Sequence, residues 1–369
     1  MYSHIAAVCQ KIRALSRGLV RSYREEQKYS LDRHIFVLMD VINKCNLRCI
    51  MCGYSTSKNI PRTIIERNSF ENIAKTVFPL SGQVNFSCVY EPFTFEGILD
   101  YLETAVKYNI PKLTLTTNGL LLNRAQIEEI VTLGFPQMNI SIDGATKRTY
   151  ESIRIGGQFN KLIENLQNLA AIKQERNQET PRIQFNFVLM EENIEEVSLF
   201  IRIMSQFRPY KLVFVHRNNK LPSAGQRLKI EFTLKQALAE CVSHKVLFEE
   251  VPNLCLSFEE ILQAYGCDME GMPQVVHQCS DPWHFMRFAP NGDVFMCPSI
   301  GEPAGNILHS PIVDIWNGEV YNKLRKQLDQ GIPPSSCQSC HFSNMGLVQF
   351  RQLQDAIEHT IVQHMKLKG

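Results

Sequence analysis

An alternation of strand-like and helix-like segments runs through residues 34–216 and leaves few folds open to this chain. Each apolar, strand-like segment is separated from the next by a segment with helical periodicity. Strands in such a pattern pair in parallel through right-handed crossovers. Eight repeats would close a full barrel, so the six repeats seen here predict an α/β fold with a partial (β/α)6 barrel, whose ligands bind at the carboxyl ends of the strands. The expected strands are 34–42, 83–87, 112–117, 137–143, 182–190 and 211–216, and the expected helices are 68–78, 96–108, 123–133, 158–175 and 192–206.

Composition and charge narrow the class of protein. Apolar residues make up 44% and charged residues 21% of the 369 residues, as is usual for globular proteins. The formal net charge of +2 gives no global reason to expect nucleic acid or an anionic membrane as a partner. No apolar run reaches the roughly 20 residues of a transmembrane helix, and no secretory signal is visible. We therefore expect a cytoplasmic protein without a transmembrane segment.

The alternation is expected to end near residue 220, where the domain organisation changes. The barrel is assigned to residues 35–220, and residues 221–278 to a linker and a helix, the helix at 233–248. Residues 279–345 are rich in Cys, Pro and Gly and form a small second domain, followed by a C-terminal helix at 346–369. Residues 1–34 read as an amphipathic helical extension that packs on the barrel; a membrane-surface helix and an organellar transit peptide are the alternatives.

Three cysteines in the spacing C-x3-C-x2-C, Cys45, Cys49 and Cys52, follow the first expected strand. A disulfide framework is typical of short secreted domains, whereas clustered cysteines in a long chain more often hold a metal. Zinc sites usually take four protein ligands. Three thiolates on one short loop instead suit a [4Fe–4S] cluster whose fourth iron stays open for a substrate or cofactor.

A second group of cysteines lies in the small domain and comprises Cys279, Cys297, Cys337 and Cys340. Asn291-Gly292, flanked by apolar residues, predicts a hairpin between the first two of these cysteines. Four thiolates suit either a zinc ribbon or a closed [4Fe–4S] cluster, and the spacing alone leaves both open. Cys255 and Cys267 are the alternative ligands for one position of this set.

Further motifs connect the two cysteine groups. "CVYEPF" (88–93) ends the second strand, "TLTTNG" (114–119) ends the third, and "ISIDGATKRTYESIRIGGQF" (140–159) follows the fourth. In this order, with both cysteine groups, they resemble the radical S-adenosylmethionine (SAM) superfamily, and in particular its members with a C-terminal twitch or SPASM-like auxiliary-cluster domain. The match departs from the family at "CVYEPF", where both glycines of the usual Gly-Gly-Glu-Pro motif are absent.

The resemblance implies three cofactors: a [4Fe–4S] cluster on the first cysteine group, SAM at its open iron, and a second, auxiliary [4Fe–4S] cluster on the later cysteines. It also implies a set of SAM contacts, with Glu91 at the ammonium, Asn118 at the ribose, Ser141 and Arg154 at the carboxylate, Asn186 as a polar contact and Leu189 beside the adenine. A guanidinium suits a carboxylate because the two groups pair through parallel hydrogen bonds.

Residues for the chemical step are less clearly marked. Asp143, His216 and Arg217 are the candidates, because each ends a strand at the edge where ligands bind. The alternatives are a helix cap for Asp143 and a purely structural role for His216. Aromatic and basic residues beside Cys279 either contact substrate or pack the small domain, and packing is favoured; they are Trp283, His284 and Arg287.

Three functions follow. The first is a radical SAM oxidoreductase that abstracts hydrogen from a small polar or sugar-like molecule, with the auxiliary cluster as electron acceptor, as in 2-deoxy-scyllo-inosamine dehydrogenase-type enzymes. It would need an external one-electron donor of the flavodoxin or ferredoxin type. The second is a maturase of a ribosomal peptide, or an epimerase, of the SPASM class. The third is a non-catalytic protein that binds zinc or nucleic acid, which the net charge of +2 does not favour.

Overall fold

The computed structural model describes residues 35–57, 60–87, 89–216, 224–251, 255–256, 258–265, 279, 281–297, 300–332, 334–338 and 361. The segments expected as helices at 1–34 and 346–369 lie outside these residues, apart from Ile361. Arg217, Cys267 and Cys340 also lie outside them. Among the described residues, no helix is long and apolar enough to cross a bilayer.

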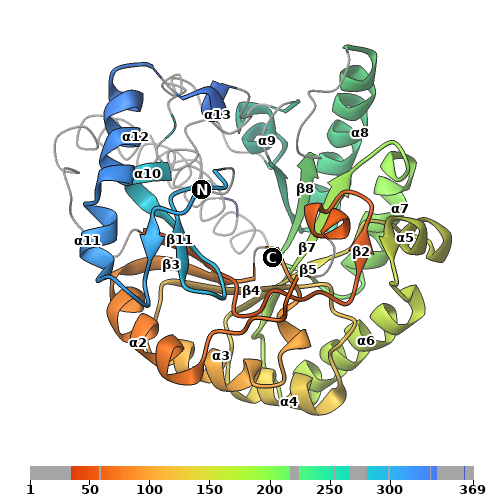
Figure 1. Cartoon of the computed structure of the whole chain (residues 1–369). Coiled ribbons are helices and arrows are strands. Elements are labelled where there is room, and N and C mark those ends of the chain that lie inside the picture. The colour runs from red at the N-terminus through yellow and green to blue at the C-terminus, as the bar shows by residue number, and fades with distance from the viewer. Residues whose placement is uncertain are drawn as a thin grey trace, which may run out of the picture.

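One curved, mostly parallel sheet forms the centre of the protein (Figure 1). Its strand order is β12-β11-β10-β1-β3-β4-β5-β7-β8-β9. Neighbours from β10 to β9 are parallel, whereas β11 is antiparallel to both of its neighbours. The strands are β1 (Ile35–Met39), β3 (Ser81–Phe86), β4 (Lys112–Thr117), β5 (Gln137–Ser141), β7 (Arg182–Leu189), β8 (Lys211–His216), β9 (Leu247–Val251), β10 (Phe285–Phe288), β11 (Asp293–Phe295) and β12 (Gly305–Asn306).

Helices cover the outer face of the sheet, as the ring of coiled ribbons in Figure 1 shows. Those of the barrel are α2 (Arg67–Val77), α3 (Ile98–Val106), α4 (Arg124–Thr132), α5 (Lys147–Ile153), α6 (Phe159–Glu175), α7 (Val197–Ser205), α8 (Ala224–Ser243) and α9 (Phe258–Ala264). Those of the C-terminal part are α10 (Asp281–His284), α11 (Ile312–Trp316), α12 (Glu319–Asp329) and α13 (Ser335–Gln338). Short 3-10 turns connect some of them: η1 (Gly53–Thr56), η2 (Phe78–Leu80), η3 (Pro92–Thr94) and η4 (Ile194–Glu196).

The expected partial barrel with a small C-terminal cysteine-rich part is confirmed, and all six expected strands are present. The expectation that the alternation ends near residue 220 is wrong. Helix α8 begins at Ala224, inside the segment that reads as a linker, and β9 then adds a seventh parallel strand beside β8. The region 221–278 therefore continues the barrel pattern for one more helix and strand.

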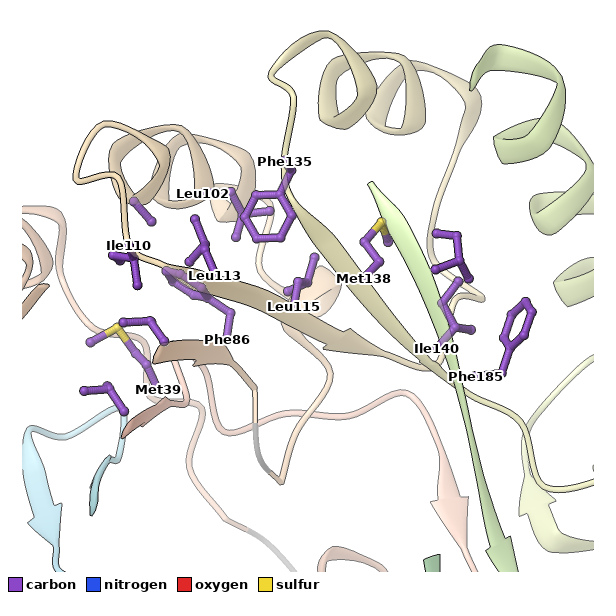
Figure 2. Close-up of a cluster of buried hydrophobic side chains, with 14 of the residues drawn as sticks. Met39, Phe86, Leu102, Ile110, Leu113, Leu115, Phe135, Met138, Ile140 and Phe185 are labelled. Carbon is purple, nitrogen blue, oxygen red and sulfur yellow. The ribbon is translucent and has the colours of Figure 1, made fainter. Parts of the chain in front are cut away.

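The main core lies between the strands and the outer helices. Alternate side chains of each strand point to this side, as period-two geometry requires. Figure 2 shows Met39, Phe86, Leu115 and Ile140 among the side chains that the strands send into this layer, where they meet Leu102 of α3 and other apolar groups. These five side chains are fully buried, which explains why the outer helices need an apolar face.

The inner face of the sheet carries polar side chains instead. The hydroxyls of Thr114 and Thr116 donate to Asn85 Oδ1 at 2.7 and 3.1 Å. The side-chain amide of Gln184 donates to Asn186 Oδ1 at 2.7 Å. Buried polar groups need such partners, so this network fixes the amides on the side that a ligand of the barrel would meet.

The C-terminal part extends the barrel sheet at its other edge. β10 pairs in parallel with β1, and the expected hairpin follows as β10 and β11, with Gly292 in the turn at φ 86°. A residue with a Cβ is strained at this φ, so glycine suits the turn. The sequence gives no local sign of the β1–β10 pairing, which places the second cysteine group next to the barrel.

Candidate functional site

The loop after β1 holds the first three cysteines. Its two-residue strand β2 (Arg48–Cys49) pairs antiparallel with β6 (Arg154–Ile155), so that Cys49 lies opposite Arg154. The N–H of Cys52 donates to the carbonyl of Cys49 at 3.0 Å, and the N–H of Leu47 donates to Cys45 Sγ at 3.4 Å. The loop therefore has a defined conformation at the carboxyl edge of the sheet.

Cys45, Cys49 and Cys52 form no disulfide. Burial raises the pKa of Cys45 to about 11, and the charges of Cys49 and Cys52 act in the same direction. Burial also raises the pKa of Cys49, although the charge of Arg154 opposes this shift. Thiols with raised pKa values stay protonated until a metal ion displaces the proton. Three close, partly buried thiols of this kind fit the three protein ligands of an iron–sulfur cluster.

Glu91 lies directly behind the cysteine loop. Its carboxylate accepts hydrogen bonds from the Asn118 N–H at 2.7 Å, the Thr117 hydroxyl at 2.7 Å and the Phe93 N–H at 3.2 Å. Burial raises the pKa of Glu91 to about 7, against the effect of these hydrogen bonds. Its backbone N–H donates to the carbonyl of Lys44 at 2.9 Å. Glu91 thus joins β4 to the loop, and its predicted contact with the SAM ammonium stays a prediction.

Asn118 also supports the loop. Its side-chain amide donates to Asn46 Oδ1 at 2.8 Å, and its own Oδ1 accepts from the N–H of Leu120 at 3.0 Å. Gly119 follows at φ 75°, as an Asn-Gly turn requires. The predicted ribose contact of Asn118 would therefore share this side chain with the loop.

Asp143 and Arg154 form a buried ion pair. Arg154 Nη2 lies 2.6 Å from Asp143 Oδ2, and the side chains are 8% and 0% exposed. The other carboxylate oxygen of Asp143 accepts from the N–H of Val188 at 2.8 Å. Burial raises the pKa of Asp143, against the charge of Arg154 and the Val188 hydrogen bond. The cap of α5 is Thr146 rather than Asp143, so Asp143 instead holds the guanidinium that lies behind Cys49.

Sequence reasoning missed Glu196, which clamps the start of α5. Its carboxylate accepts from the N–H groups of Ala145 and Thr146 at 2.7 and 3.1 Å, and from the hydroxyls of Thr146 and Thr149 at 2.7 and 2.6 Å. Partial burial works to raise the pKa of Glu196, but these hydrogen bonds outweigh it and hold the pKa below its ordinary value. Glu196 therefore fixes the segment that leads to Arg154.

Replacing Glu196 by alanine is expected to lower the unfolding free energy by roughly 2 kcal/mol at pH 7, because several donors lose a charged acceptor. A carboxylate with a lowered pKa stabilises the fold above its unfolded pKa, and that stability is lost as pH falls through the folded pKa. The difference in unfolding free energy between the wild type and Glu196→Ala should therefore be smaller at low pH. Thermal unfolding at pH 7 and pH 4 measures this difference. Glu195→Ala is the matched control, since that side chain is 77% exposed and forms an ion pair with Lys229. Equal deficits in the two variants would contradict the role of Glu196.

The remaining predicted residues divide between the two faces of the sheet. Ser141 and Asn186 are neighbours across β5 and β7, and Asn186 belongs to the polar network of the inner face. Leu189 and His216 are neighbours across β7 and β8. They follow Phe187 and Phe214 by two residues, and both of these rings contact Phe200 of α7.

Period-two geometry therefore places Leu189 and His216 on the helix-facing side of their strands. This placement does not favour the adenine contact expected of Leu189 or the catalytic role considered for His216, and both stay predictions. His216 Nε2 instead lies 2.7 Å from Glu250 Oε1 on β9.

The second cysteine group gathers in the C-terminal part. Burial raises the pKa of Cys279, and the charges of Asp281, Cys297 and Cys337 act in the same direction. The N–H of Ile300 donates to Cys297 Sγ at 3.2 Å. Three of the four expected ligands are thus brought together, and Cys340 lies outside the described residues.

The residues beside Cys279 mostly pack the small domain. His284 is 1% exposed, and the guanidinium of Arg287 lies over the ring of Phe295, 4.2 Å from its centroid. Trp283 packs against the hydrophobic core. These contacts agree with the packing role that the sequence favours for them.

Comparisons with known proteins agree with this geometry. The family model of the radical SAM superfamily matches residues 39–203, and the model of an iron–sulfur cluster-binding domain, SPASM, matches residues 279–341. The chain therefore carries a radical SAM domain followed by a SPASM domain. The expected cofactors are thereby confirmed at the level of the family: a [4Fe–4S] cluster, SAM, and auxiliary iron–sulfur chemistry in the SPASM domain.

Several known proteins are similar to this chain over most of its length. An AdoMet-dependent heme synthase of Methanosarcina barkeri is 23% identical over 76% of this chain and 82% of its own length. The mycofactocin maturase MftC of Mycobacterium tuberculosis is 22% identical over 86% of this chain and 78% of its own. The fold is similar to that of Streptococcus suis SuiB bound to S-adenosylmethionine, with a TM-score of 0.62, 14% identity, and coverage of 89% of this chain and 75% of SuiB.

Proposed function

We propose that this radical SAM protein abstracts a hydrogen atom from a small polar substrate and oxidises it, with the auxiliary cluster as electron acceptor. Cys45, Cys49 and Cys52 would hold the [4Fe–4S] cluster, which together with SAM would supply the one-electron chemistry that removes the hydrogen. The observation that carries the proposal is the cysteine loop at the carboxyl edge of the sheet, held in place by Glu91, Asn118 and the strand that bears Arg154.

The residues of the barrel would bind and orient the reactants. Cys45, Cys49 and Cys52 would hold the cluster, and Ser141 and Asn186 would offer hydrogen-bonding groups to SAM from the inner face. The buried pair of Asp143 and Arg154 would keep the strand behind Cys49 in position. These roles rest on the placement of the residues and on the family motifs that contain them.

The SPASM domain supports an oxidation. Abstraction leaves the substrate one hydrogen atom short, and loss of one further proton and one electron gives a product oxidised by two electrons. A cluster on Cys279, Cys297, Cys337 and Cys340 has all four ligands from protein, so it would accept that electron rather than bind substrate. An external one-electron donor would then be needed for the cluster in the barrel.

The inner face favours a polar substrate. Amide and hydroxyl groups of β3, β4, β5 and β7 line it, and Lys211 forms an ion pair of 2.7 Å with Glu249 across β8 and β9. Both of these charged side chains are largely buried. Buried charges are stable only with partners of this kind. Lys211 begins β8, so this pair lies toward the amino end of the strands, and a ligand at the carboxyl edge would meet the amides and hydroxyls of the inner face instead.

A second candidate is modification of a ribosomal peptide. It is favoured by the mycofactocin maturase among the relatives, which spans 86% of this chain. The heme synthase relative, which spans 76%, favours a non-peptide substrate instead. Both candidates share the first half of the reaction and differ in what supplies the hydrogen atom.

The test is anaerobic. Protein reconstituted to about eight irons per chain, the number for two cubane clusters, is incubated with SAM and dithionite, and 5′-deoxyadenosine is measured. We expect cleavage of SAM, and transfer of deuterium into 5′-deoxyadenosine from a labelled polar small molecule. Absence of cleavage at full iron content would refute the proposal, whereas transfer from a labelled peptide alone would favour the second candidate.

A further inference from the structure

A third group of metal-binding side chains lies apart from both cysteine groups. It consists of His216 at the end of β8, Glu250 in β9 and Cys255 in the segment after β9, and we call it the His216 cluster. One ligand atom from each of the three residues lies within 4.8 Å of the other two. No sequence motif unites these residues, because His216 and Glu250 lie 34 positions apart in the chain.

The carboxylate of Glu250 is the centre of the cluster. Its Oε1 lies 2.7 Å from His216 Nε2 and accepts from the N–H of Cys255 at 2.9 Å, and its Oε2 accepts from the N–H of Leu256 at 2.9 Å. Glu250 is fully buried, His216 is 7% exposed and Cys255 is half-buried. The backbone donors hold the carboxylate in one orientation, as the outer partners of metal ligands do.

The cluster lies on the helix-facing side of the sheet. His216 follows Phe214 by two residues, and Glu250 follows Phe248 by two, so each pair shares a face. The rings of Phe214 and Phe248 stack with centroids 5.4 Å apart, and Phe214 also contacts Phe200 of α7. The cluster is therefore separated by the sheet from the polar inner face where substrate is expected.

We propose that His216, Glu250 and Cys255 bind one zinc ion. Imidazole nitrogen, carboxylate oxygen and thiolate sulfur are the three donor types that zinc takes in proteins. A carboxylate and a thiolate together carry two negative charges, which balance a divalent cation in a buried place where an unbalanced charge would be costly. The thiol proton of Cys255 leaves when zinc binds, and a water molecule takes the fourth position.

The position of the site suggests what the ion does. β9 is the last strand at its edge of the sheet, paired only with β8 among the described strands. Zinc would join the ends of β8 and β9 to the segment at Cys255, which begins the connection toward the SPASM domain. The ion is therefore a structural clamp on the edge of the barrel, distinct from the redox chemistry of the iron–sulfur clusters.

The experiment measures metal content in the intact, cluster-loaded protein. Protein with about eight irons per chain, so that both cluster sites are filled, is incubated anaerobically with one equivalent of zinc, desalted, and analysed for zinc and iron. We expect about one zinc per chain beside the full iron content, and a zinc X-ray absorption edge with one sulfur and otherwise nitrogen or oxygen neighbours. Failure to retain zinc at full iron content would overturn the proposal.

Variants locate the ion. Cys255→Ser and His216→Asn should each weaken zinc binding by more than about 100-fold, since even outer-shell partners are worth 10- to 100-fold, while the iron content stays unchanged. Glu250→Gln keeps one acceptor oxygen for the backbone donors and should lose zinc as well, which covers the case that another variant does not fold. The matched control is Cys241→Ala, a cysteine buried in α8 outside the cluster. Zinc retained by the three variants, as by the control, would overturn the assignment.

Discussion

Cys49→Ala is expected to abolish the cleavage of SAM and to lower the iron content from about eight to about four atoms per chain. Cys49 is the central cysteine of the loop after β1, is 9% exposed and lies opposite Arg154 in the β2–β6 pair. With two thiolates left, the loop cannot hold three irons of a cubane cluster. The SPASM domain should keep its own cluster, because its cysteines lie in a different part of the fold.

Two matched variants make this result specific. Cys241→Ala removes a fully buried cysteine of α8 and should leave both the iron content and SAM cleavage intact. Cys297→Ala should lose the auxiliary cluster while the [4Fe–4S] cluster of the barrel stays in place. Iron analysis, electron paramagnetic resonance of the reduced protein and 5′-deoxyadenosine formation are the measurements. A Cys49→Ala protein that cleaved SAM as fast as Cys241→Ala would show that the cluster lies elsewhere.

The sequence predicts the barrel well because its strands carry local signals, and it misses β9 for a physical reason. The strand Leu247–Val251 contains Glu249 and Glu250, which break the apolar run that identifies the other strands. Both charges are accommodated by tertiary partners, Lys211 for Glu249 and His216 for Glu250. Such partners are not visible in a local window, so the sequence assigns the first two residues of this strand to the end of the expected helix 233–248 and the rest to the linker.

The start of α8 is missed for a similar reason. Gly225 follows Ala224 at the beginning of the helix, and glycine is a poor helix former. The pairing of β10 with β1 is entirely tertiary, since the paired residues Phe36 and Phe285 lie far apart in the chain. A pairing of this kind is determined by the assembled fold rather than by the periodicity of one segment.

For the site, motifs predict which residues gather but not what each side chain binds. Glu91, Asn118 and Arg154 all reach the cysteine loop or its partner strand, as their motifs suggest. Their side chains, however, are engaged with protein groups that no motif specifies, such as Asp143 for Arg154. Glu196 contributes to the same region from 50 residues away, so no local pattern could reveal it.

Arg154→Met is expected to destabilise the protein by about 3–5 kcal/mol, because it removes one partner of a buried ion pair and leaves the other charge uncompensated. Asp143 is 0% exposed, and the two partners described above are Arg154 and the N–H of Val188. Of these two, the variant would leave only the N–H of Val188. Methionine replaces the unbranched apolar stem of arginine, so the loss of packing by that stem is kept small. Thermal unfolding of the cluster-loaded protein is the measurement.

The stability loss caused by Arg154→Met should also depend on pH, because it leaves Asp143 without its charged partner. Burial already raises the pKa of Asp143, and loss of the Arg154 charge would raise it further. A carboxyl whose folded pKa lies above its unfolded value contributes stability at low pH that is lost as pH rises through the folded pKa. The deficit of Arg154→Met should therefore be larger at pH 8 than at pH 5, because the protonated carboxyl tolerates burial. A deficit independent of pH would mean that Asp143 is not the group left without its partner.

Two comparisons separate the loss of the ion pair from the loss of an arginine. Arg67→Met removes an arginine that is half-exposed and paired with Glu71 and Asp100, so it should lower the unfolding free energy far less than Arg154→Met does. The double variant Asp143→Asn with Arg154→Met removes both charges and should recover part of the stability, since an amide costs less to bury than an unpaired carboxylate. If the double variant lost as much unfolding free energy as the two single variants lose in sum, the two side chains would not act as a pair. The strand behind Cys49 would then have to be supported by other contacts.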